Sequence, residues 1–554
     1  MHFLFLLATR CFILLNNTAT NSSTCTKNDP CGFLSKSFNE NYRNFTDIQI
    51  VENEIVDDKI SIFINITLFC STHGINLCGL NQTISLSSKT NKQQNQTYII
   101  KLKNTKRFNI ENFTFTDIEY PWIHCENGKV NFDGIYFTHS KSQILEIDED
   151  SSVKFSSCCF LSNFVNSKHL VNINNSFVVF TNCTFDSISK SPLSYNSIIK
   201  VTDSSVNLDS CSIVSAYHNY AFFESHSSEF TVTNFTSTKN CGSFLFRGFG
   251  NSTLVFQFSI FIENSCMLFY LENSLIDSTN LTIQQNCINE PIFHILNDSS
   301  ISFHDSFFNH NSCGPIANIY QSKVLIHDCL FSDNLSPTNL FYIDVNSNFY
   351  IKSSKLTNST TIYGSIFYAS HSHLNLNQII FNSAFSRVCG SVLKLKETHF
   401  KGSHLSFSNI HSVEKGAICV ESCIENGNKF YINDMESFDA NDKDFYFEIS
   451  DSEFLNNWSE NQRSIYSNQC NGFISNSVFS ETMEEEISRV LFDDCKNCTF
   501  KDPPETIEQE IIESKDNNFI LLISLTIISL FLILFVMKRK ILVSFRRITR
   551  KHHH

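Results

Sequence analysis

The feature that most constrains this chain is a repeat of about 25 residues. The stretch SISFHDSFFNHNSCGPIANIYQ, residues 300–321, aligns with the following stretch, SKVLIHDCLFSDNLSPTNLFYI, after a shift of 23 positions. Ile301 then matches Val324, and Phe308 matches Phe331. Similar units recur along the chain at spacings of about 22 to 29 residues. One repeat of this length is a single supersecondary unit that must stack on its neighbours to bury its apolar side.

Each unit contains short runs in which apolar and polar residues alternate. Alternation with a period of two predicts strands, and no helical periodicity separates the runs. The 55 Phe residues can fill an interior column, and the chain has only 15 Gly and 8 Pro. We therefore expect an all-β fold, a right-handed parallel β-helix in which a column of aromatic side chains faces inward. A leucine-rich repeat and a string of β-sandwiches are the alternatives, although the leucine-rich signature is not found.

Asn recurs where the second strand of each unit ends. Asn accepts the left-handed turn conformation, and its side chain can bond the backbone of the next coil. Stacked Asn ladders of this kind stabilise parallel stacks. The positions are Asn163, Asn264, Asn286, Asn311 and Asn334.

The two ends of the chain predict a single-pass membrane protein. Residues 519–537, FILLISLTIISLFLILFVM, carry no charge and as a helix would span about 28 Å, close to the thickness of a bilayer core. The basic residues that follow place this end in the cytoplasm. The first 18 residues resemble a secretory signal, although Arg10 interrupts the apolar run, and an uncleaved anchor is the alternative.

These features predict six segments and a plasma-membrane location with a large extracellular region and the N-terminus outside. The segments are a signal peptide at 1–18, an N-terminal cap with the first strands at 19–100, the β-helix at 101–500, an acidic stalk at 501–518, a transmembrane helix at 519–537 and a basic tail at 538–554.

Two residue patterns agree with an extracellular location. N-x-Ser/Thr sequons are acceptors for N-glycosylation on exposed loops of secreted chains. The candidates are Asn44, Asn65, Asn81, Asn95, Asn112, Asn182, Asn234, Asn251, Asn280, Asn358 and Asn457. The chain has 21 Cys, and removal of Cys11 with the signal leaves an even number, which suggests pairing in an oxidising compartment.

Cysteines gather in two columns of the repeat, and stacked coils would bring them within disulfide reach. We expect some pairing between neighbouring coils, with stacked free thiols as the alternative. The disulfide candidates are Cys25, Cys31, Cys70, Cys78, Cys158, Cys183, Cys241, Cys266, Cys287, Cys313, Cys495 and Cys498. The pair in CKNC, residues 495–498, could also be redox-active or bind zinc, but a single C-x-x-C outside the cell favours a structural role.

Few residues suggest catalysis or metal binding. His304–Asp305 and His327–Asp328 stack in the alignment and could act as general bases, but we expect them to occupy solvent-facing turns. The acidic run 148–150 could hold calcium or form a solvated turn. Without the seven basic residues of the tail, 34 basic residues face 55 acidic ones, a net charge of −21 that disfavours nucleic-acid binding. We expect no cofactor, no metal and no enzymatic activity.

The repeat resembles that of polymorphic-membrane-protein-like β-helix surface proteins. FIEN (261–264), FNHN (308–311), FSDN (331–334) and FLNN (454–457) match its first half, and CGPIA (313–317), YGSIF (363–367), CGSVL (389–393) and KGAIC (415–419) match its second half in a degenerate form. The single C-terminal span with a short basic tail is similar to the protist members of this group. The resemblance implies a cell-surface role, commonly adhesion, without enzymatic activity.

We therefore expect a surface-display protein, an adhesin or a protein that binds a host cell, the matrix or a glycan through exposed Asn, Ser, His and Tyr along its face. A membrane-anchored carbohydrate-active enzyme and an inert antigenic coat protein are the alternatives.

Overall fold

The computed structural model describes residues 108–500, except 117, 119–120, 166–168, 191–194, 313, 423–446, 460–463, 468–472, 481–493 and 497. Before residue 108 it describes Leu102 and the backbone of strands β1 (Phe12–Leu15), β2 (Asp47–Ile50), β3 (Glu54–Val56), β4 (Ile75–Leu86) and β5 (Ile100–Lys103). The chain divides into two units, Met1–Phe500 and Lys501–His554, and the second lies outside the described residues.

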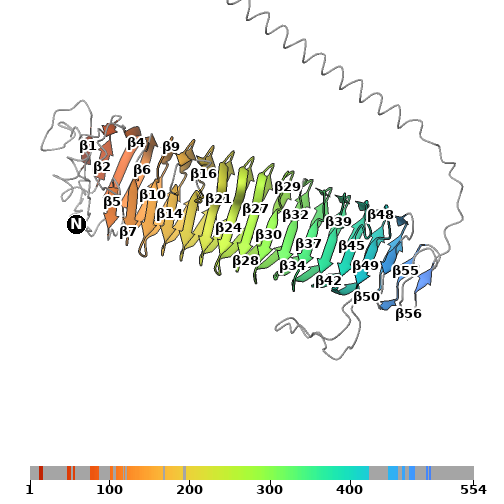
Figure 1. Ribbon diagram of the computed structural model, residues 1–554. Coiled ribbons are helices and arrows are strands. Elements are labelled where there is room, and N and C mark those ends of the chain that lie inside the picture. Colours follow the sequence, from red (N-terminus) through yellow and green to blue (C-terminus); the bar gives the residue numbers. More distant parts are fainter. Residues whose placement is uncertain are drawn as a thin grey trace, which may run out of the picture. The chain divides into compact units, whose positions relative to one another are not determined.

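The first unit is a parallel β-helix, as the repeat predicts, in which successive coils stack strand on strand (Figure 1). Each coil contributes an a strand, a b strand and a c strand in chain order, and every strand pairs in parallel with its equivalent one coil away. The long strand β6 (Phe108–Thr116) pairs with both the first a strand and the first b strand described below.

The a strands are mostly five residues long. They are β8 (Lys129–Asp133), β11 (Ser152–Ser156), β15 (Phe177–Thr181), β19 (Ser205–Asp209), β22 (Glu229–Thr233), β25 (Thr253–Gln257), β28 (Leu275–Thr279), β31 (Ser300–His304), β34 (Lys323–His327), β38 (Asn348–Lys352), β42 (His373–Asn377), β46 (His399–Ser403), β50 (Phe447–Ser450), β54 (Phe473–Ser475) and β56 (Asp494–Lys496).

The b strands follow after a two-residue turn. They are β9 (Tyr136–Thr138), β12 (Cys159–Leu161), β16 (Thr184–Asp186), β20 (Ser212–Val214), β23 (Thr236–Thr238), β26 (Ile260–Ile262), β29 (Thr282–Gln284), β32 (Phe307–Asn309), β35 (Leu330–Ser332), β39 (Lys355–Thr357), β43 (Ile380–Asn382), β47 (Ser406–Ser408), β51 (Glu453–Leu455), β55 (Val478–Phe479) and β57 (Thr499–Phe500).

The c strands close each coil. They are β7 (Ile123–Glu126), β10 (Leu145–Asp148), β14 (Val171–Asn174), β18 (Ile199–Thr202), β21 (Tyr217–His226), β24 (Cys241–Phe249), β27 (Ser265–Glu272), β30 (Phe293–Leu296), β33 (Ala317–Tyr320), β37 (Phe341–Asp344), β41 (Phe367–Ser370), β45 (Leu393–Lys396), β49 (Ile418–Ser422) and β53 (Ile465–Ser467). Two-residue strands lie between the b and c strands in some coils: β13 (Phe164–Val165), β17 (Ser189–Lys190), β36 (Leu335–Ser336), β40 (Thr360–Thr361), β44 (Phe385–Ser386), β48 (His411–Ser412) and β52 (Trp458–Ser459).

The alignment that defines the repeat is confirmed residue by residue. Ile301 pairs with Val324, and Phe308 pairs with Phe331 one coil further on. Both Phe rings are buried and lie stacked with centroids 4.5 Å apart. Elsewhere Phe132 stacks on Phe155 at 4.8 Å. The expected inward aromatic column is therefore present, and each ring buries a large apolar area and contacts its own equivalent.

The Asn residues after the b strands form the expected ladder. Asn264 Nδ2 donates to Asn286 Oδ1 at 3.1 Å, and Asn286 Nδ2 donates to Asn311 Oδ1 at 3.0 Å. The same Asn286 Oδ1 accepts the backbone N–H of Asn264 at 2.8 Å. One detail of the prediction was wrong: the left-handed residue is the one just before the Asn, for example Gln285 (φ 56°) before Asn286. The Asn is buried because its amide must meet the backbone of the adjacent coil.

We predict that Asn286→Ala loosens the stack locally. The change removes the acceptor for two donors of Asn264 and leaves buried polar groups unpaired, which should cost roughly 2–4 kcal/mol. Because each coil contacts only its neighbours, amide hydrogen exchange should accelerate in β26, β29 and β32 and not in distant coils. Asn289→Ala, at an exposed position three residues away, is the control. Unchanged exchange in the Asn286 variant would contradict the ladder's role.

The cysteine prediction needs several corrections. Cys158, Cys183, Cys241 and Cys266 are free thiols. The Cys183 thiol donates to Thr181 O at 3.4 Å. At the same turn position of another coil, the Ser306 hydroxyl donates to His304 O. The thiol therefore takes the place of a serine hydroxyl. Cys241 pairs in register with Ser265, not Cys266, so the neighbouring residues Ser265 and Cys266 point to opposite faces.

Other disulfide candidates have different outcomes. Cys287 and Cys498 are disulfide-bonded. Cys25, Cys31, Cys70 and Cys313, and the side chains of Cys78 and Cys495, lie outside the described residues.

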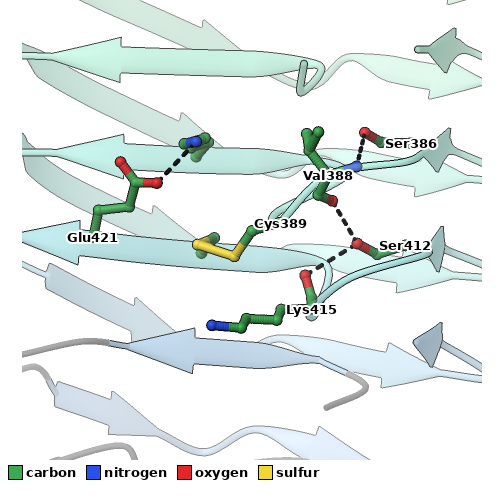
Figure 2. The surroundings of a disulfide bond; sticks show 8 residues. Ser386, Val388, Cys389, Ser412, Lys415 and Glu421 are labelled. Carbon is green, nitrogen blue, oxygen red and sulfur yellow. Dashed lines mark hydrogen bonds and ion pairs between the residues drawn. A yellow bond between two sulfur atoms is a disulfide. The ribbon is translucent and has the colours of Figure 1, made fainter. Parts of the chain in front are cut away.

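A disulfide that the sequence analysis did not single out joins Cys389 to Cys419 in the next coil (Figure 2). Its loops are also tied by Ser412, whose hydroxyl donates to Val388 O at 2.8 Å. Gly390, directly after Cys389, has a φ of 72°. A Cβ atom at Gly390 would lie 2.8 Å from the Cys419 Cβ. The Cys-Gly pair therefore lets the loop approach the neighbouring coil, and CGSVL and KGAIC contained this signal.

We predict that Cys389→Ser weakens the coils around β45 and β49. The bond spans 30 residues, and loss of a cross-link over that length costs roughly 3–4 kcal/mol in the chain-entropy account. Limited proteolysis without reductant should cleave the variant faster than the parent at these coils. Cys241→Ser, which removes an exposed free thiol, should not change the cleavage rate. Equal cleavage of the parent and the Cys389 variant would count against this stabilisation.

The predicted stalk, transmembrane helix at 519–537 and basic tail lie outside the described residues. Of the predicted signal peptide, the structure describes the backbone of β1 (Phe12–Leu15), which pairs in parallel with β2. Among the residues that the structure describes, no helix is long and apolar enough to cross a bilayer.

Candidate functional site

The outward face of the c strands carries a continuous row of aromatic side chains. Along c strands such as β30, β33 and β37 the first and third residues are buried and the second and fourth are half-buried, so equivalent outward side chains form columns. Tyr270, His294, Asn318, Tyr342 and Tyr368 occupy one column in successive coils.

Tyr320 completes the row at the coil where that column has Asn318. Its ring comes from the adjacent outward column and lies 5.8 Å from the His294 ring and 5.7 Å from the Tyr342 ring. The remaining neighbours are 5.5 Å apart, Tyr270 to His294, and 5.2 Å apart, Tyr342 to Tyr368. We call Tyr270, His294, Tyr320, Tyr342 and Tyr368 the aromatic row.

An arginine begins the row at its N-terminal end. The Arg247 guanidinium lies over the rings of Tyr220, Phe249 and Tyr270, at 4.5, 4.1 and 4.8 Å from their centroids. Burial lowers the pKa of Arg247 from its usual value, while the neighbouring Tyr270 and Glu272 oppose that shift. These cation–π contacts hold the side chain flat against the face.

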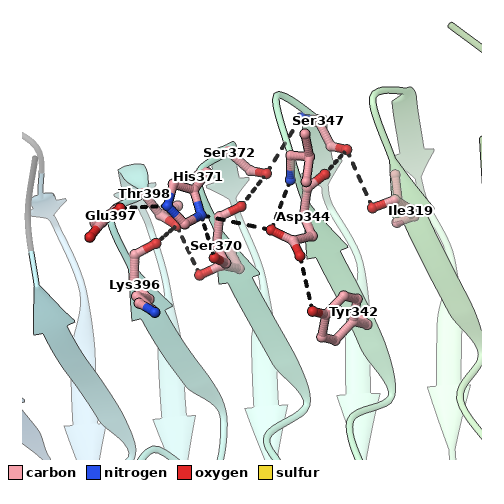
Figure 3. A network of polar contacts seen from close by, with 12 residues as sticks. Ile319, Tyr342, Asp344, Ser347, Ser370, His371, Ser372, Lys396, Glu397 and Thr398 are labelled. Atoms are coloured by element: carbon pink, nitrogen blue, oxygen red, sulfur yellow. Dashed lines mark hydrogen bonds and ion pairs between the residues drawn. The ribbon is translucent and has the colours of Figure 1, made fainter. Parts of the chain in front are cut away.

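Carboxylates lie beside the row and pair with one of its hydroxyl groups and with a nearby histidine. Tyr342 donates its hydroxyl to Asp344 Oδ2 at 3.0 Å, and His371 from the next coil lies between Asp344 and Glu397 (Figure 3). Burial, followed by the hydrogen bond to Asp344, raises the pKa of Tyr342. Burial also raises the pKa of Tyr320 and lowers the pKa of His294. These shifts favour the uncharged forms of Tyr320, Tyr342 and His294, which present hydroxyl and imidazole groups.

The row supports binding of an extended ligand. Ring faces in the row pack on one another, as Tyr270 does on His294 and Tyr342 on Tyr368, so the row presents ring edges and polar tips to a ligand. The edges supply contact area and the polar tips supply hydrogen bonds. The sequence analysis expected contacts from exposed Tyr and His but did not identify this row. The signal was present in the segments LFYL, IFHIL, LFYI and SIFYA, whose residues at equivalent positions supply Tyr270, His294, Tyr342 and Tyr368.

The His–Asp pairs match the expectation of solvent-facing turns only in part, because the histidines end the a strands and only the aspartates lie in the turns. His304 and His327 pair in register on the a strands, with ring centroids 5.9 Å apart, and Asp305 and Asp328 take the left-handed turn positions after them. The structure adds a contact that the sequence did not indicate, between Ser302 Oγ and His304 Nε2 at 2.8 Å. Both residues lie on a strand whose backbone bonds the adjacent coils, so nearby N–H groups are not free to form an oxyanion hole.

The acidic run 148–150 lies at a turn. Asp148 accepts from His124 Nε2 at 3.0 Å, and Asp150 accepts from Asn175 Nδ2 at 3.2 Å. Asp150 also lines a shallow groove of turn residues that includes Asn175 and Asp203. Within the described part of the chain, no three His, Cys, Asp or Glu side chains are grouped to hold a metal ion.

Six of the sequon residues that the structure describes are exposed: Asn112, Asn182, Asn234, Asn251, Asn280 and Asn358. All six have positive φ. Asn182, Asn234 and Asn280 share the turn between the a and b strands, whereas Asn112 lies within the long strand β6. Asn457 differs from the expectation, because it is 3% exposed and accepts the backbone N–H of Ile410 at 3.1 Å. Asn44, Asn65, Asn95 and the side chain of Asn81 lie outside the described residues.

A buried lysine lies inside the wall of the helix, away from the row. Lys190 is 1% exposed, and its Nζ donates to Ser197 O at 2.7 Å. Lys190 pairs with Val165 of the preceding coil. In the following coil His218 of β21 takes the equivalent position, because Ser189 pairs with Tyr217. Burial lowers the pKa of Lys190 to about 7, although Glu224 opposes the shift.

We predict that Lys190→Met stabilises the protein in a pH-dependent way. Because the folded pKa of about 7 lies below the unfolded value, the unfolded chain binds more protons between these two values, and stability rises with pH across that range. The gain in melting temperature from Lys190→Met should therefore be largest below pH 7 and shrink as the pH rises toward the unfolded value. Lys355→Met, at an exposed position, should show no such trend. A gain that is constant with pH would refute the buried-charge explanation.

One of the comparisons with known proteins, the family model, bears on the type of fold. The sequence model of the family described as right handed beta helix region matches residues 73–237. A search of curated proteins finds no match.

Three solved structures are similar to the chain at low identity. They are tailspike protein 3 of bacteriophage CBA120 (11% identity, TM-score 0.32, covering 70% of this chain and 58% of that one), the periplasmic alginate epimerase AlgG (10%, 0.20, 82% and 85%) and PfbA, a surface adhesin of Streptococcus pneumoniae (10%, 0.20, 61% and 84%). The chain thus spans little more than half of the tailspike.

Proposed function

We propose that this protein is a cell-surface display protein that binds ligands on another cell or on the matrix through the aromatic row, without covalent chemistry. The observation that carries the proposal is the continuity of the row from Tyr270 to Tyr368, in which each ring contacts the next. A face built from repeated equivalent contacts suits weak multivalent binding, because each rung adds a similar small contribution.

The placement of the sequons supports this choice of face. Five of the six exposed sequon residues lie in turns and Asn112 lies in β6, so the c strands that carry the row contain none of them. Glycans attached at these turns would cover the edges of the coils and leave the row open. With the apolar segment 519–537 as a single-pass anchor in the plasma membrane, the N-terminus would lie outside and the row would face the surroundings.

We predict that Tyr342→Ala together with Tyr368→Ala reduces adhesion. The double change removes two neighbouring rings and should lower the number of target cells bound by cells displaying the full chain at least about fivefold, roughly 1 kcal/mol of binding. Surface amounts are matched with an antibody to the chain. The control is Tyr136→Ala, which removes a 45% exposed ring on β9 outside the row. If the double variant binds as the parent does, the row is not the binding face.

A further inference from the structure

We propose that the aromatic row binds a single linear, uncharged polysaccharide that runs along the stack with one sugar unit per coil. This inference rests on the proposed function, since it names the ligand class for the same face. Three independent properties of the row lead to it: its spacing, its unsatisfied polar atoms and its charge.

The spacing of the row fits a pyranose chain better than a peptide. Neighbouring ring centroids are 5.2 to 5.8 Å apart. An extended peptide rises about 3.4 Å per residue, so its side chains recur on one face about every 7 Å and lose register within a few rungs. Pyranose units joined by equatorial 1→4 links repeat at nearly the distance between two coils. Successive units of such a chain are turned over relative to one another, but each unit still presents hydroxyl and C–H groups to the rung beside it.

Two buried polar atoms at the row have no hydrogen-bond partner within the described part of the chain. One is Oδ1 of Asn318, in the coil where Tyr320 covers the column, and the other is Nε of Arg247, at the N-terminal end. A buried polar atom without a partner costs free energy, so such atoms usually mark a missing partner. Asn318 Oδ1 is an acceptor and Arg247 Nε is a donor. A sugar hydroxyl can donate or accept, so separate hydroxyl groups along the chain can pair with each atom when the ring that covers it rotates away.

The charge around the row disfavours polyanions. Asp344 and Glu272 flank it, and an anionic chain along the row would pass both carboxylates. The nearest cations are already engaged, since Arg247 lies against aromatic rings and Lys394 pairs with Glu421 at 2.8 Å. The carboxylates can instead accept hydrogen bonds from hydroxyl groups. An uncharged sugar chain therefore matches the site better than a uronate or sulfated chain.

The test is calorimetric titration of the full-length chain in mild detergent. The probes are β-1,4-linked manno-oligosaccharides from two to seven units, and the matched charged probes are β-1,4-linked mannuronate oligosaccharides of equal length. We expect affinity for the uncharged series to rise with each unit up to about the length of the row and then level off. The uronate series should bind at least about tenfold more weakly.

Variants separate the row from the rest of the surface. Tyr342→Ala should weaken binding of the longest uncharged probe at least about tenfold and affect the two-unit probe much less. Tyr136→Ala, outside the row, should change neither. Uncharged and uronate probes that bind equally, or affinity that does not depend on length, would overturn the inference.

A cell assay distinguishes this inference from the proposed function. If adhesion depends on Tyr342 and Tyr368 but survives periodate treatment of the target cells and is lost after trypsin treatment, the ligand is a protein. The polysaccharide inference then fails while the binding face stands. If adhesion does not depend on these residues, the proposed function itself fails.

Discussion

The parallel hydrogen-bond ladder between coils is the constraint on which the rest of the structure depends. Because each strand pairs in register with its equivalent one coil away, every residue lies directly above the residue at the same position of the repeat. A side chain that suits one coil must therefore also suit contact with its own equivalent. This condition accounts for the stacked Phe rings inside, the Asn amides at the turn and the hydroxyl or thiol found in several of the turns after an a strand.

The same constraint acts on the outer surface, where it creates a binding face without a pocket. Equivalent outward residues of the c strands form a row because the ladder leaves them no other arrangement, and Tyr320 bridges the coil where the column has Asn318. The result is a surface whose chemical period equals the distance between coils. A ligand with a matching repeat can contact several rungs at once, whereas a compact ligand meets only a few. The geometry of the fold thus selects for extended ligands.

Much of this could be predicted from the sequence, and the misses have a common cause. The register of Ile301 with Val324 and the ladder role of Asn286 follow from the repeat alone. The pairing of cysteines does not, because Cys158 and Cys183 stack yet remain free thiols, while Cys389 reaches Cys419. Stacking brings all such residues close, and only the direction of each side chain decides which sulfurs meet. Asn457 was misplaced for a similar reason, since its sequon does not reveal that the ladder buries it.

The sequence by itself determined the period, the strand pattern and the inward aromatic column, because a stack of coils repeats locally encoded information. The tertiary structure alone decided the aromatic row, the covering of Asn318 by Tyr320 and the aromatic contacts of Arg247. These features depend on loops of unequal length between the repeats, and on which outward side chain leans over its neighbour. Neither property can be read from one coil, since both arise only when adjacent coils are placed together in space.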